Sequence, residues 1–284
     1  MTGAQARGRD DETRHFLVGL ARGLAGALLF ALPMLMTMEM WSLGLYVDRG
    51  RLLLLCLLAL PLLVVLARRI GFENVTSWGA AMRDALIAYG LGILLGAAVL
   101  LLFGILDDQP TADTIAAKVA LQSVPAGIGA LLGRSQLGRH SEARDGEDGD
   151  GGGETGYAHE LFMMMTGALF FSLNMAPTEE MVLIAYKITP VHTLVAVVVS
   201  VALMHGFVYA LHFRGSHRPA EGSTWWDPFL RFTLPGYAIA LTISLYALWT
   251  FGRLDHTGVS PAVTAAVVLG LPAAVGAASA RLVL

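Results

Sequence analysis

The chain has 284 residues, of which 55% are hydrophobic and only 14% are charged. A soluble domain usually carries about 25% charged residues, and the mean hydropathy here is +0.62, so the composition argues against a soluble protein. The net charge of -3 and the lack of a basic stripe give no reason to expect nucleic acid as a partner. The single cysteine, Cys56, leaves no disulfide framework and no thiol metal site.

Long apolar blocks follow a polar N-terminal stretch. Residues 1–14 mix both charges and have no signal-peptide pattern, so we expect a disordered cytoplasmic tail. The later blocks approach the roughly 20 residues that a helix needs to cross a bilayer. The sequence therefore predicts an all-α membrane protein of about eight transmembrane helices. These blocks cover residues 16–38, 52–67, 85–106, 114–133, 159–183, 192–211, 229–250 and 261–284.

Charge between the blocks predicts the topology. If eight spans alternate, most arginines fall on one side of the membrane, and positive charge is favoured on the cytoplasmic side. Both termini are then expected in the cytoplasm of a bacterial cell, with the chain in the inner (plasma) membrane. Residues 135–156 are acidic and glycine-rich, which predicts a flexible cytoplasmic linker.

The linker joins two stretches that repeat each other, residues 15–134 and 157–284. Gly26–Met40 matches Gly167–Met181, and Phe103-Gly-Ile-Leu-Asp107 matches Phe251-Gly-Arg-Leu-Asp255. Further matches join Trp78, Arg83, Tyr89 and Pro125 to Trp226, Arg231, Tyr237 and Pro272. Because each repeat has an even number of predicted spans, the sequence predicts two four-helix repeats related by a pseudo-two-fold axis along the membrane normal.

Two stretches also resemble a known family. Phe30-Ala-Leu-Pro-Met-Leu-Met-Thr-Met-Glu-Met-Trp41 and Pro177-Thr-Glu-Glu-Met181 are similar to those of a family of bacterial integral membrane proteins that has no assigned activity. The resemblance covers most of the chain except the linker. It implies a membrane protein and says nothing about mechanism.

A Thr-x-Glu-Met motif occurs once in each repeat. Glu39 and Glu180 occupy equivalent positions, and Thr37 and Thr178 precede them by two residues. An ionisable side chain inside a membrane helix is costly unless it faces water or a partner. Two facing carboxylates would bind a cation or share a proton. The competing interpretation places both glutamates in water near the outer interface.

The remaining candidates are weaker. Glu179 has no equivalent acid, Asp107 and Asp255 repeat at the outer ends of the third helices, and His205 lies within the sixth block. Lys118 is expected to pair with an outer aspartate or to extend towards the interface. Two methionine runs, at 34–40 and 163–165, could bind Cu(I) through their thioethers. Alternate residues of a helix point in different directions, which argues against such a site.

No enzyme motif is present, so we expect a protein that is not an enzyme and that needs no cofactor. The leading expectation is a channel or proton-coupled carrier for a small cation or proton, in which Glu39, Glu180, Thr37 and Thr178 bind the ion. The alternative is a non-transporting membrane module for signalling, sensing or assembly. The expected partners are the lipid bilayer and the transported ion. The sequence leaves open whether the chain forms a homo-oligomer, and it does not identify a metal.

Overall fold

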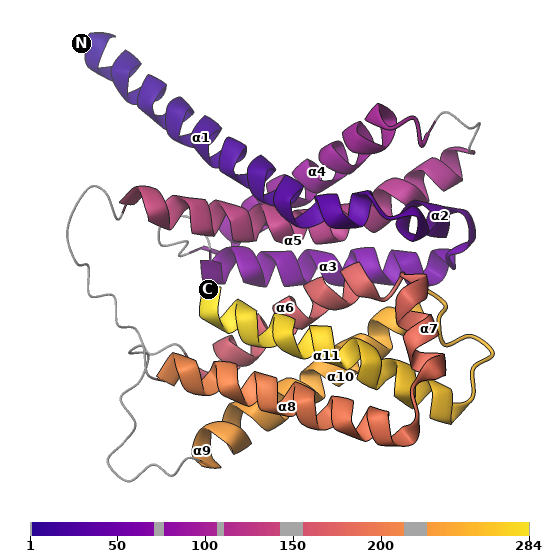
Figure 1. The fold of residues 1–284 in the computed structure, drawn as a ribbon. Coiled ribbons are helices and arrows are strands. Elements are labelled where there is room, and N and C mark those ends of the chain that lie inside the picture. Colours follow the sequence, from indigo (N-terminus) through magenta and orange to yellow (C-terminus); the bar gives the residue numbers. More distant parts are fainter. Residues whose placement is uncertain (1, 71–76, 107–110, 143–155, 213–225, 284) are drawn as a thin grey trace. The chain divides into compact units, whose positions relative to one another are not determined.

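The computed structural model describes residues 2–70, 77–106, 111–142, 156–212 and 226–283, and within these ranges it is helical, without strands (Figure 1). The helices of the first half are α1 (Thr2–Leu35), α2 (Met38–Tyr46), α3 (Arg49–Ile70), α4 (Trp78–Leu102) and α5 (Ala112–Glu142). Those of the second half are α6 (Tyr157–Met175), α7 (Glu179–Lys187), α8 (Pro190–His212), α9 (Trp226–Pro228), the π-helical turn η1 (Phe229–Thr233), α10 (Leu234–Thr250) and α11 (Val259–Val283).

The chain forms two compact units. One comprises Met1–Met36 with Leu53–Gly151, and the other comprises Thr37–Leu52 with Gly152–Leu284. Helix α2 and the start of α3 therefore belong to the same unit as the second half of the sequence. The predicted division into residues 15–134 and 157–284 is a division of the sequence into repeats, and it stays a prediction.

Helix α5 is the centre of the first unit, where it packs against α1 and α4 (Figure 1). Glycines make the close approach of α1 to α5 possible: a Cβ atom on Gly26 would lie 2.5 Å from the carbonyl oxygen of Gly129. Gly92 of α4 lies equally close to α5, because its Cβ would be 2.6 Å from the Ser123 carbonyl oxygen. Such small residues allow helix backbones to approach closely inside membranes.

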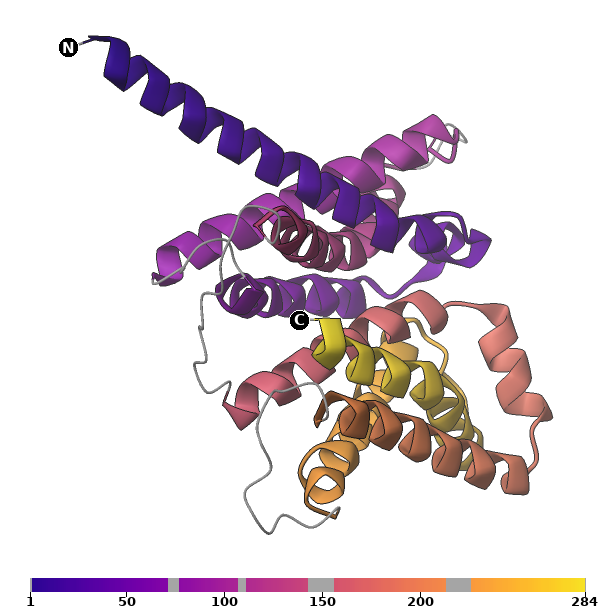
Figure 2. The same cartoon turned by 60° about the vertical axis from the view of Figure 1, so that its left-hand side comes forward.

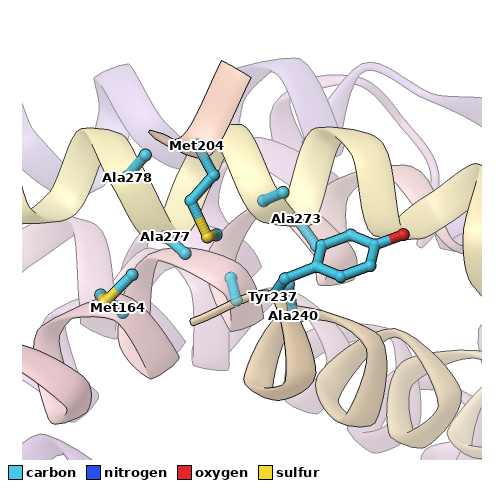
Figure 3. Packing of buried hydrophobic residues seen from close by; sticks show 9 residues of the cluster. Met164, Met204, Tyr237, Ala240, Ala273, Ala277 and Ala278 are labelled. Carbon is cyan, nitrogen blue, oxygen red and sulfur yellow. The ribbon is translucent and has the colours of Figure 1, made fainter. Parts of the chain in front are cut away.

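Helix α11 has the same role in the second unit, where α6, α8 and α10 pack around it (Figure 2). Its alanines Ala273, Ala274, Ala277 and Ala278 line a core that Met164, Met204 and Tyr237 complete (Figure 3). Gly276 lies against Gly167 of α6, since a Cβ on Gly276 would be 2.5 Å from the Gly167 carbonyl oxygen. Small residues therefore hold α11 against its neighbours, as they hold α5.

Helices α4 and α10 end in the same Schellman motif. Gly104 (φ 68°) and Gly252 (φ 71°) both have left-handed backbones. In the first half the N–H of Ile105 donates to the Leu100 carbonyl, and in the second the N–H of Arg253 donates to the Leu248 carbonyl. This bonding satisfies the last carbonyls of a helix and favours glycine at the left-handed position.

Replacing Gly252 by alanine should destabilise the protein by about 1 kcal/mol, because a Cβ atom is disfavoured in the left-handed region. Gly90→Ala is the matched control: Gly90 lies in α4 and a Cβ there would meet nothing within 4 Å. Thermal unfolding in detergent measures both variants. A Gly252→Ala protein as stable as Gly90→Ala would contradict the assignment.

Six helical segments are long and apolar enough to cross a membrane, or seven if the bent pair α6–α7 counts as one span. They are Arg49–Arg69, Trp78–Leu102, Ala112–Gly133, Pro190–Phe207, Phe229–Thr250 and Val259–Ala280. The all-helical fold with about six candidate spans is thus confirmed among the described residues, whereas the count of eight spans is not.

Four expectations differ from the structure. The block 16–38 is not one helix, because α1 ends at Leu35, and the block 159–183 is interrupted between Met175 and Glu179. Residues 2–14, expected to be disordered, continue α1. Residues 135–142 of the predicted linker extend α5, and residues 143–155 lie outside the described residues.

Candidate functional site

A short helix follows a break at the same place in each half. Helix α1 ends at Leu35 and the nine-residue α2 begins at Met38. Helix α6 ends at Met175 and the nine-residue α7 begins at Glu179. The axes of α6 and α7 differ by 92°, so the second half carries a sharply broken span or a re-entrant segment.

The two threonines of the repeated motif mark these breaks. Thr37 (φ -91°, ψ 130°) and Thr178 (φ -68°, ψ 141°) are both extended and stand at the N-cap positions of α2 and α7. The Thr178 hydroxyl does not cap α7, because it donates to the Met175 carbonyl at 2.9 Å. Pro177 adds to the break, since it has no N–H to continue the hydrogen bonding of α6.

Glu39 and Glu180 are each the second residue of their short helix. Glu39 is half-buried and Glu180 is exposed. Neither carboxylate has a hydrogen bond or ion pair among the described residues. Acidic side chains in the first turn are favoured by the positive end of the helix dipole. Both helices break before the glutamate. The predicted cost of burying a carboxylate within a continuous span therefore does not apply to these two residues.

Both glutamates belong to the same compact unit, although they come from opposite halves of the sequence. The unit contains Thr37–Leu52 together with Gly152–Leu284. Whether the two carboxylates face each other across a two-fold axis stays a prediction.

The break in the second half already binds a cationic side chain. The guanidinium of Arg253 donates a hydrogen bond to the Pro177 carbonyl, between α6 and α7. Arg253 belongs to the repeated Phe-Gly-x-Leu-Asp segment, where the first half has Ile105 in its place. The two halves therefore differ in charge at these equivalent positions, because Ile105 has no guanidinium to donate.

Asp255 binds Arg51, a residue that the sequence analysis did not single out. The Arg51 guanidinium donates to both carboxylate oxygens, at 2.8 and 3.0 Å, and to the Trp249 carbonyl at 2.7 Å. It also lies over the Trp249 ring, with 4.9 Å between the guanidinium carbon and the ring centroid. This two-oxygen pairing is the strongest geometry for an arginine and a carboxylate. It attaches the start of α3 to the end of α10.

The Arg51 hydrogen bond holds the pKa of the Asp255 carboxyl below its ordinary value, and the charges of Arg51 and His256 act in the same direction. Asp255 is thus occupied by a fixed cationic partner, which weakens its case as a site for a mobile ion. Its repeat partner Asp107 lies outside the described residues.

His205 is half-buried in α8, and its ring Nδ1 lies 3.0 Å from the hydroxyl of the buried Thr233 in η1. The Phe229 ring packs edge-on against it, with ring centroids 5.4 Å apart. This half-buried histidine thus contacts a hydroxyl and an aromatic ring, as structural histidines commonly do. Glu179 is exposed at the first residue of α7.

No group of three or more His, Cys, Asp or Glu side chains in the described ranges is placed to hold a metal ion. The methionines of the first run do not gather on one side: Met36 and Met38 are exposed, whereas Met34 and Met40 are buried. Met164 of α6 and Met204 of α8 both lie against Gly236. A Cβ atom on Gly236 would be 3.0 Å from the Met204 sulfur and 3.3 Å from the Met164 sulfur.

The family model described as "Putative integral membrane protein (DUF2391)" matches residues 19–284. The chain belongs to this family. As a DUF2391 protein with long apolar helices, it is an integral membrane protein. No curated protein and no solved structure matches the chain.

The sequence of this DUF2391 protein located the repeated motif, but it did not predict the Arg51–Asp255 ion pair or the buried Gln122. Arg51 and Asp255 are far apart in the chain, and no local pattern joins them. Gln122, a polar residue inside an apolar block, is completely buried in α5. The isolated amide within that block was the signal that could have identified it.

Proposed function

We propose that this protein transports a small cation or a proton across the membrane as a channel or proton-coupled carrier. The proposal rests on one observation: each half breaks a helix and places a glutamate at the second position of the following nine-residue helix. Broken helices with polar residues at the break are how many transporters build ion sites in the bilayer. Glu39 and Glu180 would bind the ion, supported by Thr37 and Thr178.

We also infer that the halves arose by duplication and form eight membrane-crossing elements, with both termini in the cytoplasm of a bacterial cell. The matching order of helices, the paired breaks and the paired left-handed glycines support this inference. The broken α1–α2 and α6–α7 segments would then serve as the first element of each half. No catalytic role is proposed for any residue. Whether two or more copies of the chain assemble is left open.

The alternative is a membrane module that does not transport. Its support is that Glu180 is exposed and that both glutamates stand where a helix dipole alone favours an acid. In that case the glutamates stabilise α2 and α7 and bind no mobile ion.

Ion flux into liposomes containing the purified chain separates the two functions. A pH-sensitive dye reports protons, and imposed sodium or potassium gradients test the cations. We expect Glu39→Gln and Glu180→Gln each to lower flux roughly tenfold or more, because each removes a charged ligand from the ion. The double variant should lower it little further, since the pair acts as one unit.

Glu179→Gln is the matched control, because Glu179 is adjacent, exposed and not repeated. It should retain wild-type flux. Wild-type liposomes without flux of any of the three ions, or undiminished flux in the double variant, would favour the non-transporting module.

A further inference from the structure

We propose that Thr114, Lys118 and Gln122 of α5 form a binding site for a small monovalent anion, a halide or a monocarboxylate. Residues four apart lie on one face of a helix, so the three side chains form a polar column along α5. This site is separate from the glutamates and does not depend on their function.

The column is buried. The exposed fractions are 9% for Thr114, 7% for Lys118 and 0% for Gln122. The most apolar stretch of the span Ala112–Gly133 has 78% of its residues buried, the highest share among the candidate spans. At about 1.5 Å per residue, Gln122 lies about 15 Å along the axis from Ala112, near the middle of a hydrocarbon core about 30 Å thick.

Hydrogen-bonding capacity remains unused at this depth. The Lys118 ammonium donates to the Ile105 carbonyl at 3.1 Å, and an ammonium has three donors. Neither the nitrogen nor the oxygen of the Gln122 amide has a partner among the described residues. Buried polar groups are normally paired with protein or with an unseen water or ion. An unpaired amide one helical turn from an ammonium therefore indicates a ligand.

The second half shows that the fold does not require these residues. At the equivalent positions α11 has Pro261, Ala265 and Leu269, in register with the Pro125–Pro272 match. Helix α11 nonetheless packs centrally in its unit through glycine and alanine contacts, as α5 does. The polar column is thus specific to one repeat, which favours a binding role over a packing role.

The donors determine the class of ligand. Lys118 repels cations, whereas its ammonium and the amide N–H groups of Gln122 bind negative oxygen or halide. The Thr114 hydroxyl lies 3.1 Å from the Thr111 hydroxyl and extends the column towards the N-terminus of α5. The Gln122 amide oxygen would accept from a water that accompanies the anion.

Binding is measured on the full-length protein in detergent. Sodium chloride or sodium acetate is titrated while sodium gluconate keeps the ionic strength constant. Chloride-35 NMR line broadening reports direct binding, and the thermal unfolding midpoint reports stabilisation. The wild type should show a saturable response to at least one of the two anions.

Lys118→Ala and Gln122→Leu introduce the residues of the second half and should weaken the apparent affinity about tenfold or more. Lys187→Ala removes an exposed lysine and should leave the affinity unchanged. Gln122→Leu decides the matter if Lys118→Ala does not fold. A wild type without a saturable response, which would indicate water alone, overturns the proposal. Unchanged affinity in Gln122→Leu overturns it too.

Discussion

Gly276→Ala is expected to destabilise the protein by about 3 kcal/mol or more, because it forces two helix backbones apart. The new Cβ would lie 2.5 Å from the Gly167 carbonyl oxygen and 2.6 Å from Cδ2 of Phe171. A side chain can rotate away from such a clash, but the backbone of α6 can move only with its whole helix. Gly26→Ala should do the same in the first unit, where the Cβ would be 2.5 Å from the Gly129 carbonyl oxygen.

Gly206→Ala is the control with the opposite expected sign. Gly206 lies in α8, and a Cβ there would meet nothing within 4 Å, so alanine should stabilise the helix by about 0.5–1 kcal/mol. Thermal unfolding in detergent, with size-exclusion profiles to verify folding, compares all three variants. Equal midpoints for Gly276→Ala and Gly206→Ala would show that α6 and α11 do not approach each other through these glycines.

Arg51→Ala is expected to lower the unfolding midpoint by several degrees. It leaves the Asp255 carboxylate and the Trp249 carbonyl without the guanidinium and removes the contact with the Trp249 ring. These hydrogen bonds are exposed, so water replaces the lost guanidinium in part and the expected loss is moderate. Part of the effect should disappear at high salt, because the Asp255 side chain is 45% exposed.

The same pair predicts a pH dependence. Arg51 lowers the folded-state pKa of Asp255, so the unfolded chain binds more protons and stability rises with pH. The contribution is fully present above the ordinary aspartate pKa and is lost as pH falls through the lowered one. The midpoint difference between wild type and Asp255→Asn should shrink on acidification. An Asp255→Asn effect that is unchanged at low pH, or that adds fully to Arg51→Ala, would exclude the pairing.

The repeated motif illustrates how far sequence alone reaches. The matches of Glu39 with Glu180 and of Thr37 with Thr178 predicted equivalent positions, and in both halves these residues stand at the start of a nine-residue helix. Block length indicated continuous spans there, because hydropathy does not detect a break between two apolar helices. The threonines are extended N-cap residues, and this conformation ends the preceding helix within an otherwise apolar block.

What the sequence determined by itself is the membrane class, most of the spans and the repeated positions, because these depend on local composition and on order along the chain. The tertiary structure decided which residues meet. It joined Arg51 to Asp255, brought Arg253 to the break after α6 and buried Gln122 beside Lys118 on an enclosed helix. The two arginine contacts and the burial of Gln122 arise from packing between segments distant in the chain, and such packing leaves no periodic signal in any one segment.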